Sequence, residues 1–344
     1  MKNILLPLFI GLSFTMFSQN NVKYAETINT KDLEKHLTVL ASDSLEGRET
    51  GQKGQKMAAD YIMNHFKNIG VPPYKWNTYY QHFRVKNGRH TCKCDDCDID
   101  FLKKILGANK WIKGENVLAY IEGTDLKEEL IVITAHYDHL GIHEGKVYNG
   151  ADDDGSGTVA AMEIAEAFML AKKDGNGPRR SILVMCVSGE EKGLLGSKYY
   201  TDHPIYSLEK TVANLNIDMI GRVDDWHENG DYVYLIGADM LSQELHDLSE
   251  QVNEEFIGLE LDYTFNAEDD PNRYYYRSDH YNFAKNNIPV IFYFNGVHED
   301  YHKVTDIVDK IDFEKVQRIA RLVFLTAWEL ANRDERVLLN ELEE

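Results

Sequence analysis

The feature that most restricts the fold is a series of strand-length apolar runs, most of them separated by stretches with helical spacing. Near-continuous apolar strands that alternate with amphipathic helices are typical of a mostly parallel sheet covered on both faces. The apolar runs occupy residues 116–123, 129–136, 181–189, 211–219, 231–237 and 289–295, and helical spacing recurs at 31–41, 54–69, 158–173, 240–256 and 313–332. We therefore expect one α/β domain of three layers, with a mixed, mostly parallel central sheet flanked by helices.

Residues 1–19 have the pattern of a signal peptide. Lys2 precedes an apolar stretch over 4–17, and the polar residues Ser18 and Gln19 follow it. A membrane anchor is the alternative interpretation, but the stretch is short for a bilayer span. We expect an exported protein, secreted or periplasmic, with no stable membrane insertion once the signal has been removed.

The remaining residues, 20–344, are expected to form the single domain. It would begin with a helical segment over 30–70, in which Gly70 is placed to end the second helix. Residues 72–112 are rich in aromatic and polar side chains and lack a clear period. We expect them to be a surface insertion.

The chain has four cysteines, and three of them lie in this expected insertion, namely Cys92, Cys94 and Cys97. One local disulfide with a leftover thiol is the first interpretation, because export implies an oxidising compartment. A thiolate metal site is the alternative, although a full structural site usually has four ligands. Cys186 stands alone in an apolar run and is expected to be a small buried residue.

The charge balance excludes one broad class of function. The chain has 57 Asp and Glu against 37 Lys and Arg, a net charge of −20. Binding to nucleic acid depends on clustered cations that contact phosphates, and the sequence has no basic stripe. We therefore expect no nucleic-acid partner.

Polar residues with metal-binding chemistry occur at several ends of the expected strands. In sheets of this kind, ligands bind beyond the carboxyl ends of the strands. The segments that supply them are "AHYDH" at 135–139, "ADDDGSG" at 151–157, "SGEE" at 188–191, Asp218 and His302. They bring His, Asp, Glu, Asp and His to one edge. Five such groups, with one carboxylate able to bridge, suit a pair of divalent ions.

Each of these segments has an ordinary interpretation when taken alone. "HYDH" can be two surface histidines, and "ADDDGSG" can be a polar loop that caps the next helix through Asp154 or Ser156. "SGEEKG" can be a solvated loop. The ordered set at consecutive strand ends is what indicates a metal site.

The motifs "AHYDHLG", "NGADDDGSG", "SGEEKGLLGS", "NLNIDMIG" and "YHKVTD" resemble those of the co-catalytic dizinc aminopeptidases. That broad family also includes glutamate carboxypeptidases and glutaminyl cyclases. "LASDSLEGRETGQKGQKMAADYI" is similar to the N-terminal segment of secreted bacterial members. The resemblance covers roughly residues 36–70 and 115–330, and it implies two Zn²⁺ ions and a peptide substrate with a free N-terminus.

The resemblance also implies a role for individual residues. Asp153 would bridge both ions. His136 and Asp218 would complete one site, and Glu191 and His302 would complete the other. Glu190 would bind no metal and would serve as the general base that takes a proton from the attacking water.

Further residues are expected to support this chemistry. Asp138, two residues after His136, would hold the imidazole of that histidine through its carboxylate. Tyr275, three residues before Ser278, is the best match to a tyrosine that stabilises the oxyanion in the family. Asp279 and His280 are expected to position this loop, and His139 and His298 are expected to be lining or surface residues.

The resemblance therefore implies an exported zinc-dependent aminopeptidase that hydrolyses N-terminal residues from peptides, and three rival functions remain. A glutaminyl cyclase shares the scaffold but uses one zinc ion, whereas all five ligand positions are kept here. A carboxypeptidase needs cations for the substrate carboxylate, and the available candidates are Arg222, Arg273 and Arg277. A non-catalytic binding module is the third possibility, but such modules usually lose a ligand or the base.

Overall fold

The computed structural model describes residues 21–74, 77–86, 111–267 and 269–341 of the chain. The expected signal peptide at 1–19 and the three clustered cysteines lie outside the described residues. Cys186 is described, and it is fully buried, as expected.

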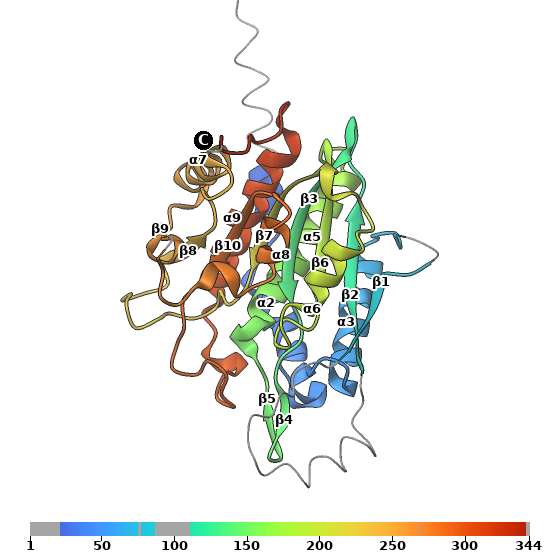
Figure 1. Cartoon of the computed structure of the whole chain (residues 1–344), viewed down its shortest axis with the longest axis vertical. Helices are drawn as coiled ribbons and strands as arrows, with labels where there is room; N and C mark the ends of the chain where they lie inside the picture. Colours follow the sequence, from blue (N-terminus) through green and yellow to red (C-terminus); the bar gives the residue numbers. More distant parts are fainter. Residues whose placement is uncertain (1–20, 75–76, 87–110, 268, 342–344) are drawn as a thin grey trace, which may run out of the picture.

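An eight-stranded sheet runs through the described part of the molecule (Figure 1). The four central strands are parallel to one another, and the strand directly next to them on each side is antiparallel to them. In spatial order the strands are β1 (Tyr80–Lys86), β2 (Trp111–Ile121), β6 (Arg180–Val187), β3 (Leu126–His136), β7 (Thr211–Ile217), β10 (Val290–Phe294), β8 (Tyr232–Ile236) and β9 (Glu260–Asp262). The expected mixed, mostly parallel sheet is confirmed, and all six apolar runs are strands.

Helices cover both faces of the sheet, which completes the three layers. On one face α5 (Gly157–Lys173) and α9 (Phe313–Asn332) pack on the central strands, and α7 (Gln243–Val252) packs on α9. On the other face lie α6 (Leu195–Asp202) and α8 (His280–Ala284). The expected single α/β domain is therefore what the structure shows (Figure 1).

The alternation of side chains along β3 explains why its sequence is apolar almost throughout. Ile131 and Ile133 belong to the core cluster that includes α5 and α9. Leu130 and Val132 belong to the cluster on the opposite face, with Tyr200 of α6. Successive side chains of a strand point to opposite faces, so a strand covered on both sides needs apolar residues at every position.

The N-terminal helical segment lies on the same face of the sheet as α5 and α9. α2 (Thr30–Leu40) packs on α5 and α9, and α3 (Lys53–Asn68) packs on β2 and α5. The side chain of Asn29 accepts a hydrogen bond from the Asp32 N–H and so caps α2. Gly70 follows α3 with a φ of 92°, the left-handed conformation expected at a helix end.

The expectation of an irregular insertion at 72–112 does not hold for its described part. Residues 80–86 are strand β1, which pairs antiparallel with β2 at the edge of the main sheet. The alternation was hidden because the inward position 81 is a glutamine. Its side chain accepts a hydrogen bond from Asn116 and donates one to the carbonyl of His203.

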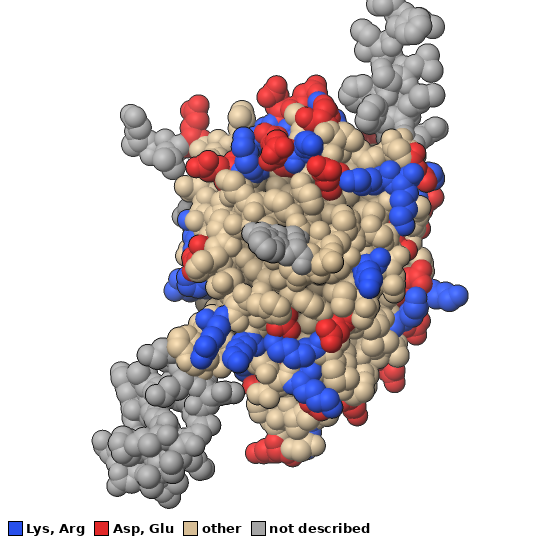
Figure 2. Space-filling view, turned by 90° about the vertical axis from the view of Figure 1, so that its right-hand side faces the viewer, with Lys and Arg blue, Asp and Glu red and all other residues tan. Residues whose placement is uncertain are grey.

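The side of the molecule over β1, β2 and α3 is shown in Figure 2. Its centre is largely uncharged, and Lys and Arg side chains mix with Asp and Glu around that centre. Charges of one sign do not gather on the described part of this face. No helix among the described residues is both long enough and apolar enough to cross a membrane.

Candidate active site

The parallel arrangement of four strands brings the expected site residues to one edge of the sheet. His136 is the last residue of β3, and Asp218 directly follows β7. Glu190 and Glu191 follow β6, and His302 follows β10. The carboxyl ends of β3, β6, β7 and β10 all lie at this edge.

The carboxylate of Asp153 lies at the centre of the cluster. Its Oδ1 is 3.3 Å from His136 Nε2, which is also 3.4 Å from Asp218 Oδ1. Its Oδ2 is 3.0 Å from His302 Nε2, which is also 3.4 Å from Glu191 Oε1. Each oxygen of Asp153 therefore faces a different group of donors.

His139 also belongs to the second group, which the sequence analysis missed. The residue is fully buried, and its Nδ1 lies 3.0 Å from Glu191 Oε1 and 3.8 Å from Asp153 Oδ2. The nitrogen and oxygen atoms that His139, Asp153 and Glu191 offer lie within 4.8 Å of one another, as do those of His136, Asp153 and Asp218. The expectation that His139 only lines the site or lies on the surface is therefore wrong. The available signal was its place three residues after His136.

The polar atoms of the cluster fit divalent metal ions. Among the described residues, His136 Nε2, Asp153 Oδ2 and Glu191 Oε1 are buried without a hydrogen-bond partner. Buried polar atoms without partners are costly, so native structures seldom contain them. Imidazole nitrogen and carboxylate oxygen are good ligands for zinc and related metals. The donor set can therefore hold metal.

The electrostatics of the protein alone point the same way. Burial opposes a charge on His302, but Asp153 and Glu191 outweigh it and raise the pKa of His302 to about 10. Burial likewise opposes ionisation of Asp153, yet His136 and His302 hold the pKa of this carboxyl well below its usual range. The clustered carboxylates are thus stabilised by positive charge between them. When no metal is bound, protonated histidines supply this charge.

The two adjacent glutamates have different surroundings. Glu191 faces the two histidines of the second group, 3.0 Å from His139 and 3.4 Å from His302. The nearest histidine nitrogen to Glu190 is His136 Nε2, at 3.9 Å from its Oε2. Glu190 lines the cavity next to the cluster. Burial raises the pKa of Glu190 well above its usual range, and the charges of Glu191 and Asp218 add to this.

Asp138 contacts His136 in a different way from the one expected. The backbone carbonyl of Asp138 lies 3.1 Å from His136 Nδ1, and its carboxylate is farther away, at 3.8 Å. The carboxylate instead accepts hydrogen bonds from the Thr50 hydroxyl, at 2.5 Å, and from the backbone N–H of Glu190, at 3.2 Å. Asp138 thus contacts both the His136 ring and the Glu190 backbone, and so fixes their relative position.

Several further carboxylates fix the loops that carry the donors. The carboxylate of Asp154 accepts from the backbone N–H groups of His136, Gly157 and Met219, at 2.9–3.0 Å. The carboxylate of Asp306 accepts from the N–H groups of Asp152 and Asp153, at 3.0–3.2 Å. These contacts join the loop at 151–156 to the ends of β3 and β7 and to the segment after β10. They hold Asp153 in place.

A buried arginine and a buried histidine complete this support. The guanidinium of Arg48 donates to the carbonyls of Leu40, Tyr137, Asn149 and Gly150, at 2.6–2.8 Å. His298 Nε2 lies 3.2 Å from Asp152 Oδ2. His298 is buried, so the expectation that it could be a surface residue is wrong.

The segment at 278–280 is placed to orient Asp218 and the neighbouring helices. The Ser278 hydroxyl donates to Asp218 Oδ2 at 2.6 Å and accepts from Asn216 Nδ2 at 2.9 Å. Asp279 accepts from the hydroxyl of Ser197 on α6, and His280 is fully buried at the start of α8. This agrees with the expected role of Asp279 in positioning the loop.

A cavity open to solvent adjoins the cluster. Its polar wall includes Asp153, Glu190, Asp218, Arg277 and Ser278, and the rest of its lining is Met219, Tyr274, Phe292, Phe294, Val297 and Tyr301. Tyr275 is not part of this lining. Its ring lies next to Gly237 and against His280 and Tyr281, while its neighbour Tyr274 and the more distant Tyr301 face the cavity.

The model of peptidase family M28 matches residues 116–327, which is more than half of the chain. The chain belongs to this family. The match begins in β2 and ends in α9, so it includes every residue of the cluster around Asp153.

Individual proteins are also similar to this chain in sequence or in fold. A probable leucine aminopeptidase of Arthroderma otae is 28% identical over 290 residues, which are 80% of this chain and 74% of that protein. The structure of a zinc aminopeptidase from Bacillus subtilis shares the fold with a TM-score of 0.67 and 16% identity, over 90% of this chain and 98% of that one. The structure of a glutaminyl cyclase of Porphyromonas gingivalis also shares the fold, with a TM-score of 0.64 and 17% identity, over 87% of this chain and 97% of that one. The M28 fold therefore does not by itself decide between hydrolysis and cyclisation.

Proposed function

We propose that this M28 protein is an exported zinc aminopeptidase that removes N-terminal residues from peptides. The observation that carries the proposal is the position of Asp153, whose two carboxylate oxygens face two separate groups of His, Asp and Glu donors. The names of similar proteins, a probable leucine aminopeptidase and a zinc aminopeptidase, support it.

The residues would divide the work as follows. His136 and Asp218 would hold one zinc ion, Glu191 with His302 the other, and Asp153 would bridge the pair. The buried ring of His139 is an additional candidate for the second ion. When bound, the ions supply Lewis acidity that polarises the scissile carbonyl and lowers the pKa of a water molecule.

Glu190 is the proposed general base. It lines the cavity without being enclosed by histidines, so a water molecule can reach its carboxylate. The carboxylate would take the proton of the attacking water and pass it to the leaving amine. Tyr275 was proposed from its position in the sequence to stabilise the oxyanion, but Tyr274 and Tyr301 line the cavity and are better placed for this role.

The composition of the cavity supports a substrate with a free amino group and an apolar first side chain. Asp153, Glu190 and Asp218 contribute negative charge to the lining, which attracts a protonated amine. Met219, Phe292 and Phe294 contribute apolar surface for a hydrocarbon side chain. We therefore propose leucine-, methionine- and phenylalanine-like residues as preferred N-terminal residues.

A panel of aminoacyl chromogenic amides tests this proposal. Each amide is offered with a free and with an acetylated amino group, in zinc buffer. An aminopeptidase cleaves only the free forms, and the apolar surface predicts faster cleavage of leucyl and phenylalanyl amides than of lysyl or glutamyl ones. Equal cleavage of the acetylated forms contradicts recognition of the amino group.

A carboxypeptidase is the second candidate because one arginine faces the cavity. Of the three arginines considered, Arg277 lines the cavity, whereas Arg222 is paired with Asp300 at 2.8 Å and Arg273 lies over the ring of Tyr276. Arg277 can hold a substrate carboxylate. Cleavage of acetylated dipeptides with a free carboxylate, and its loss in Arg277→Met, would favour this function.

The remaining alternatives have their own substrates. Conversion of N-terminal glutamine without loss of a residue identifies a cyclase. Binding of peptides without turnover of any of these substrates identifies a non-catalytic module.

Export is proposed from the signal-peptide pattern at 1–19. Sequencing the N-terminus of the protein recovered outside the cytoplasm tests this proposal.

A further inference from the structure

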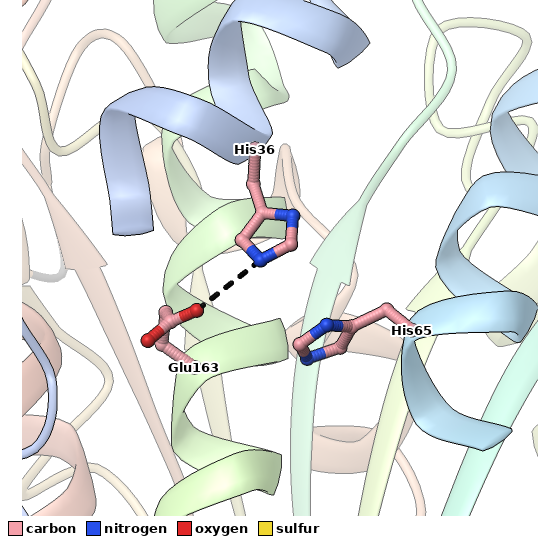
Figure 3. Close-up of side chains that lie close together, drawn as sticks. All are labelled: His36, His65 and Glu163. Carbon is pink, nitrogen blue, oxygen red and sulfur yellow. Dashed lines mark ion pairs between the residues drawn. The ribbon is translucent and has the colours of Figure 1, made fainter. Parts of the chain in front are cut away.

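A second cluster of metal-binding side chains lies among three helices and shares no residue with the active site. His36 comes from α2, His65 from α3 and Glu163 from α5, and Figure 3 shows them pointing toward one another. Each offers one nitrogen or oxygen atom, and these atoms lie within 4.8 Å of one another. The cluster lies where the N-terminal helices pack on the helical layer of the domain.

All three side chains are in core positions. His36 continues the buried stripe of α2, between Leu33 and Leu40, and His65 is buried next to Phe66 on α3. The side chains of His36, His65 and Glu163 are only 7%, 8% and 4% exposed. Apolar residues would fill such positions without a desolvation cost, so three polar groups here call for a partner.

The hydrogen bonds around the cluster leave lone pairs for such a partner. His36 Nδ1 lies 2.7 Å from the Tyr61 hydroxyl, and its Nε2 is 3.4 Å from Glu163 Oε1. A ring nitrogen of His65 lies 3.3 Å from the carbonyl of Met162. When one nitrogen of a neutral ring donates to such a group, the other keeps a lone pair, which is the usual arrangement of histidines that bind metal.

Glu163 is the group that most lacks a partner. Its Oε1 is buried and has no hydrogen-bond partner among the described residues. Burial, with the charges of Glu166 and Asp32, raises the pKa of Glu163 to about 8. Burial also lowers the pKa of both histidines to about 4, so both rings are neutral at pH 7. The cluster thus has two neutral imidazoles beside a buried carboxyl oxygen that has no hydrogen-bond partner among the described residues.

We propose that His36, His65 and Glu163 form a third metal site, which binds one divalent transition-metal ion such as zinc and fastens α2 and α3 to α5. Two imidazoles and one carboxylate are a common zinc donor set. The His65 nitrogen that faces the carbonyl of Met162, Nε2, is also the one that lies 3.7 Å from Glu166 Oε2, so His65 would bind through Nδ1 and water would complete the coordination. The site is structural in this proposal, because none of its residues lines the substrate cavity.

Metal analysis in a variant with a disabled active site tests this proposal. Asp153→Ala and the double variant Asp153→Ala/Glu163→Gln are loaded with zinc, freed of excess metal by gel filtration, and measured by mass spectrometry. The third site predicts that Glu163→Gln removes one zinc per chain. His65→Gln, which leaves the His36–Glu163 pair in place, should remove the same equivalent. The comparison holds whether or not Asp153→Ala empties the active site.

The matched control is Glu250→Gln on α7. Glu250 belongs to a group with His246 and Asp247 whose atoms also lie within 4.8 Å of one another, and both acidic residues of this group are exposed. This substitution should leave zinc content unchanged. Zinc should also raise the Tm of Asp153→Ala by more than that of the variant that also carries Glu163→Gln.

The competing explanation is a neutral hydrogen bond from the carboxyl group of Glu163 to His36. The amide of Glu163→Gln can make the same hydrogen bond. Unchanged zinc content and an unchanged response of Tm to zinc in that variant, with a normal circular dichroism spectrum, would therefore overturn the proposal.

Discussion

Glu190 and Glu191 are neighbours in the chain, yet their side chains lie in different surroundings, which is why we propose different roles for them. Glu191 is enclosed by His139 and His302, whereas Glu190 lines the substrate cavity. We expect Glu190→Ala to keep its zinc content and to lose about 10²–10⁴-fold in kcat, the range for removal of a general base. Metal analysis and steady-state kinetics of the same preparation check both parts. Full activity would disprove the assignment.

Asp153 and the two histidines near Glu191 give a second prediction at the scale of residues. Asp153→Ala should lose active-site zinc together with activity, because both donor groups meet at this carboxylate. Separate His139→Gln and His302→Gln variants decide which imidazole binds the second ion. Replacing the histidine that binds the ion should lower the zinc content. Replacing the other histidine should change mainly the kinetics. A variant at Asp153 that still carried two active-site ions would refute the bridging role.

The sequence predicts the donors better than it predicts their supports. His136, Asp218 and Glu191 could be placed because they follow apolar runs, and parallel strands bring such positions together. The roles of Asp154 and Asp306 could not, since they depend on backbone N–H groups of distant segments that converge only in the fold. Tyr275 shows the same limit, because a shift of one residue decides which ring faces the cavity.

Among the elements, those with a clear period were predicted and the irregular ones were not. The buried strands and long helices follow from continuous apolar runs and from helical spacing. α8 has only five residues, too few for a period, and β1 carries a polar residue at an inward position. Tertiary contacts, not local pattern, decide such elements.

The helix α9 carries a buried lysine that gives a prediction about stability. Lys315 is 2% exposed, and its Nζ lies 3.4 Å from the centre of the Tyr232 ring. Burial lowers its pKa from 10.5 to about 7, although Asp152 and Asp224 oppose this shift. Between pH 7 and 10.5 the unfolded chain therefore binds a proton that the folded chain does not, and this residue makes stability rise with pH.

Replacing this lysine should remove the effect. We expect Lys315→Met to be more stable than the original chain at pH 7, by roughly 1–3 kcal/mol, because the buried amine no longer has to be desolvated. Its free energy of unfolding should also rise less between pH 7 and pH 9. Urea titrations of both proteins at the two pH values measure this difference. Parallel pH dependences would contradict the prediction.

At the scale of the whole molecule, the candidate active site joins segments that are far apart in the sequence. The cluster around Asp153 connects the end of β3, the loop at 151–156, the loop after β6 and the segment after β10. A ligand that binds only the folded state stabilises it, so removing the proposed ions should destabilise the entire domain.

Chelation tests this prediction directly. Treatment with EDTA should abolish activity and lower the Tm, and zinc should restore both. The Tm of Asp153→Ala should respond less to EDTA, and only through the proposed site at His36. Calorimetry with and without chelator measures these shifts. A Tm that EDTA does not change would contradict a structural contribution of metal.

The place of Asp306 in the chain affects when the site can form. This carboxylate accepts the N–H groups of Asp152 and Asp153, so the loop with the central carboxylate is fixed by a residue about 150 positions later. During synthesis, the loop leaves the ribosome long before its anchor does. If the proposed zinc site is correct, high-affinity loading would wait until the chain has been made and folded as far as Asp306. The compartment in which that step takes place would then have to supply the zinc.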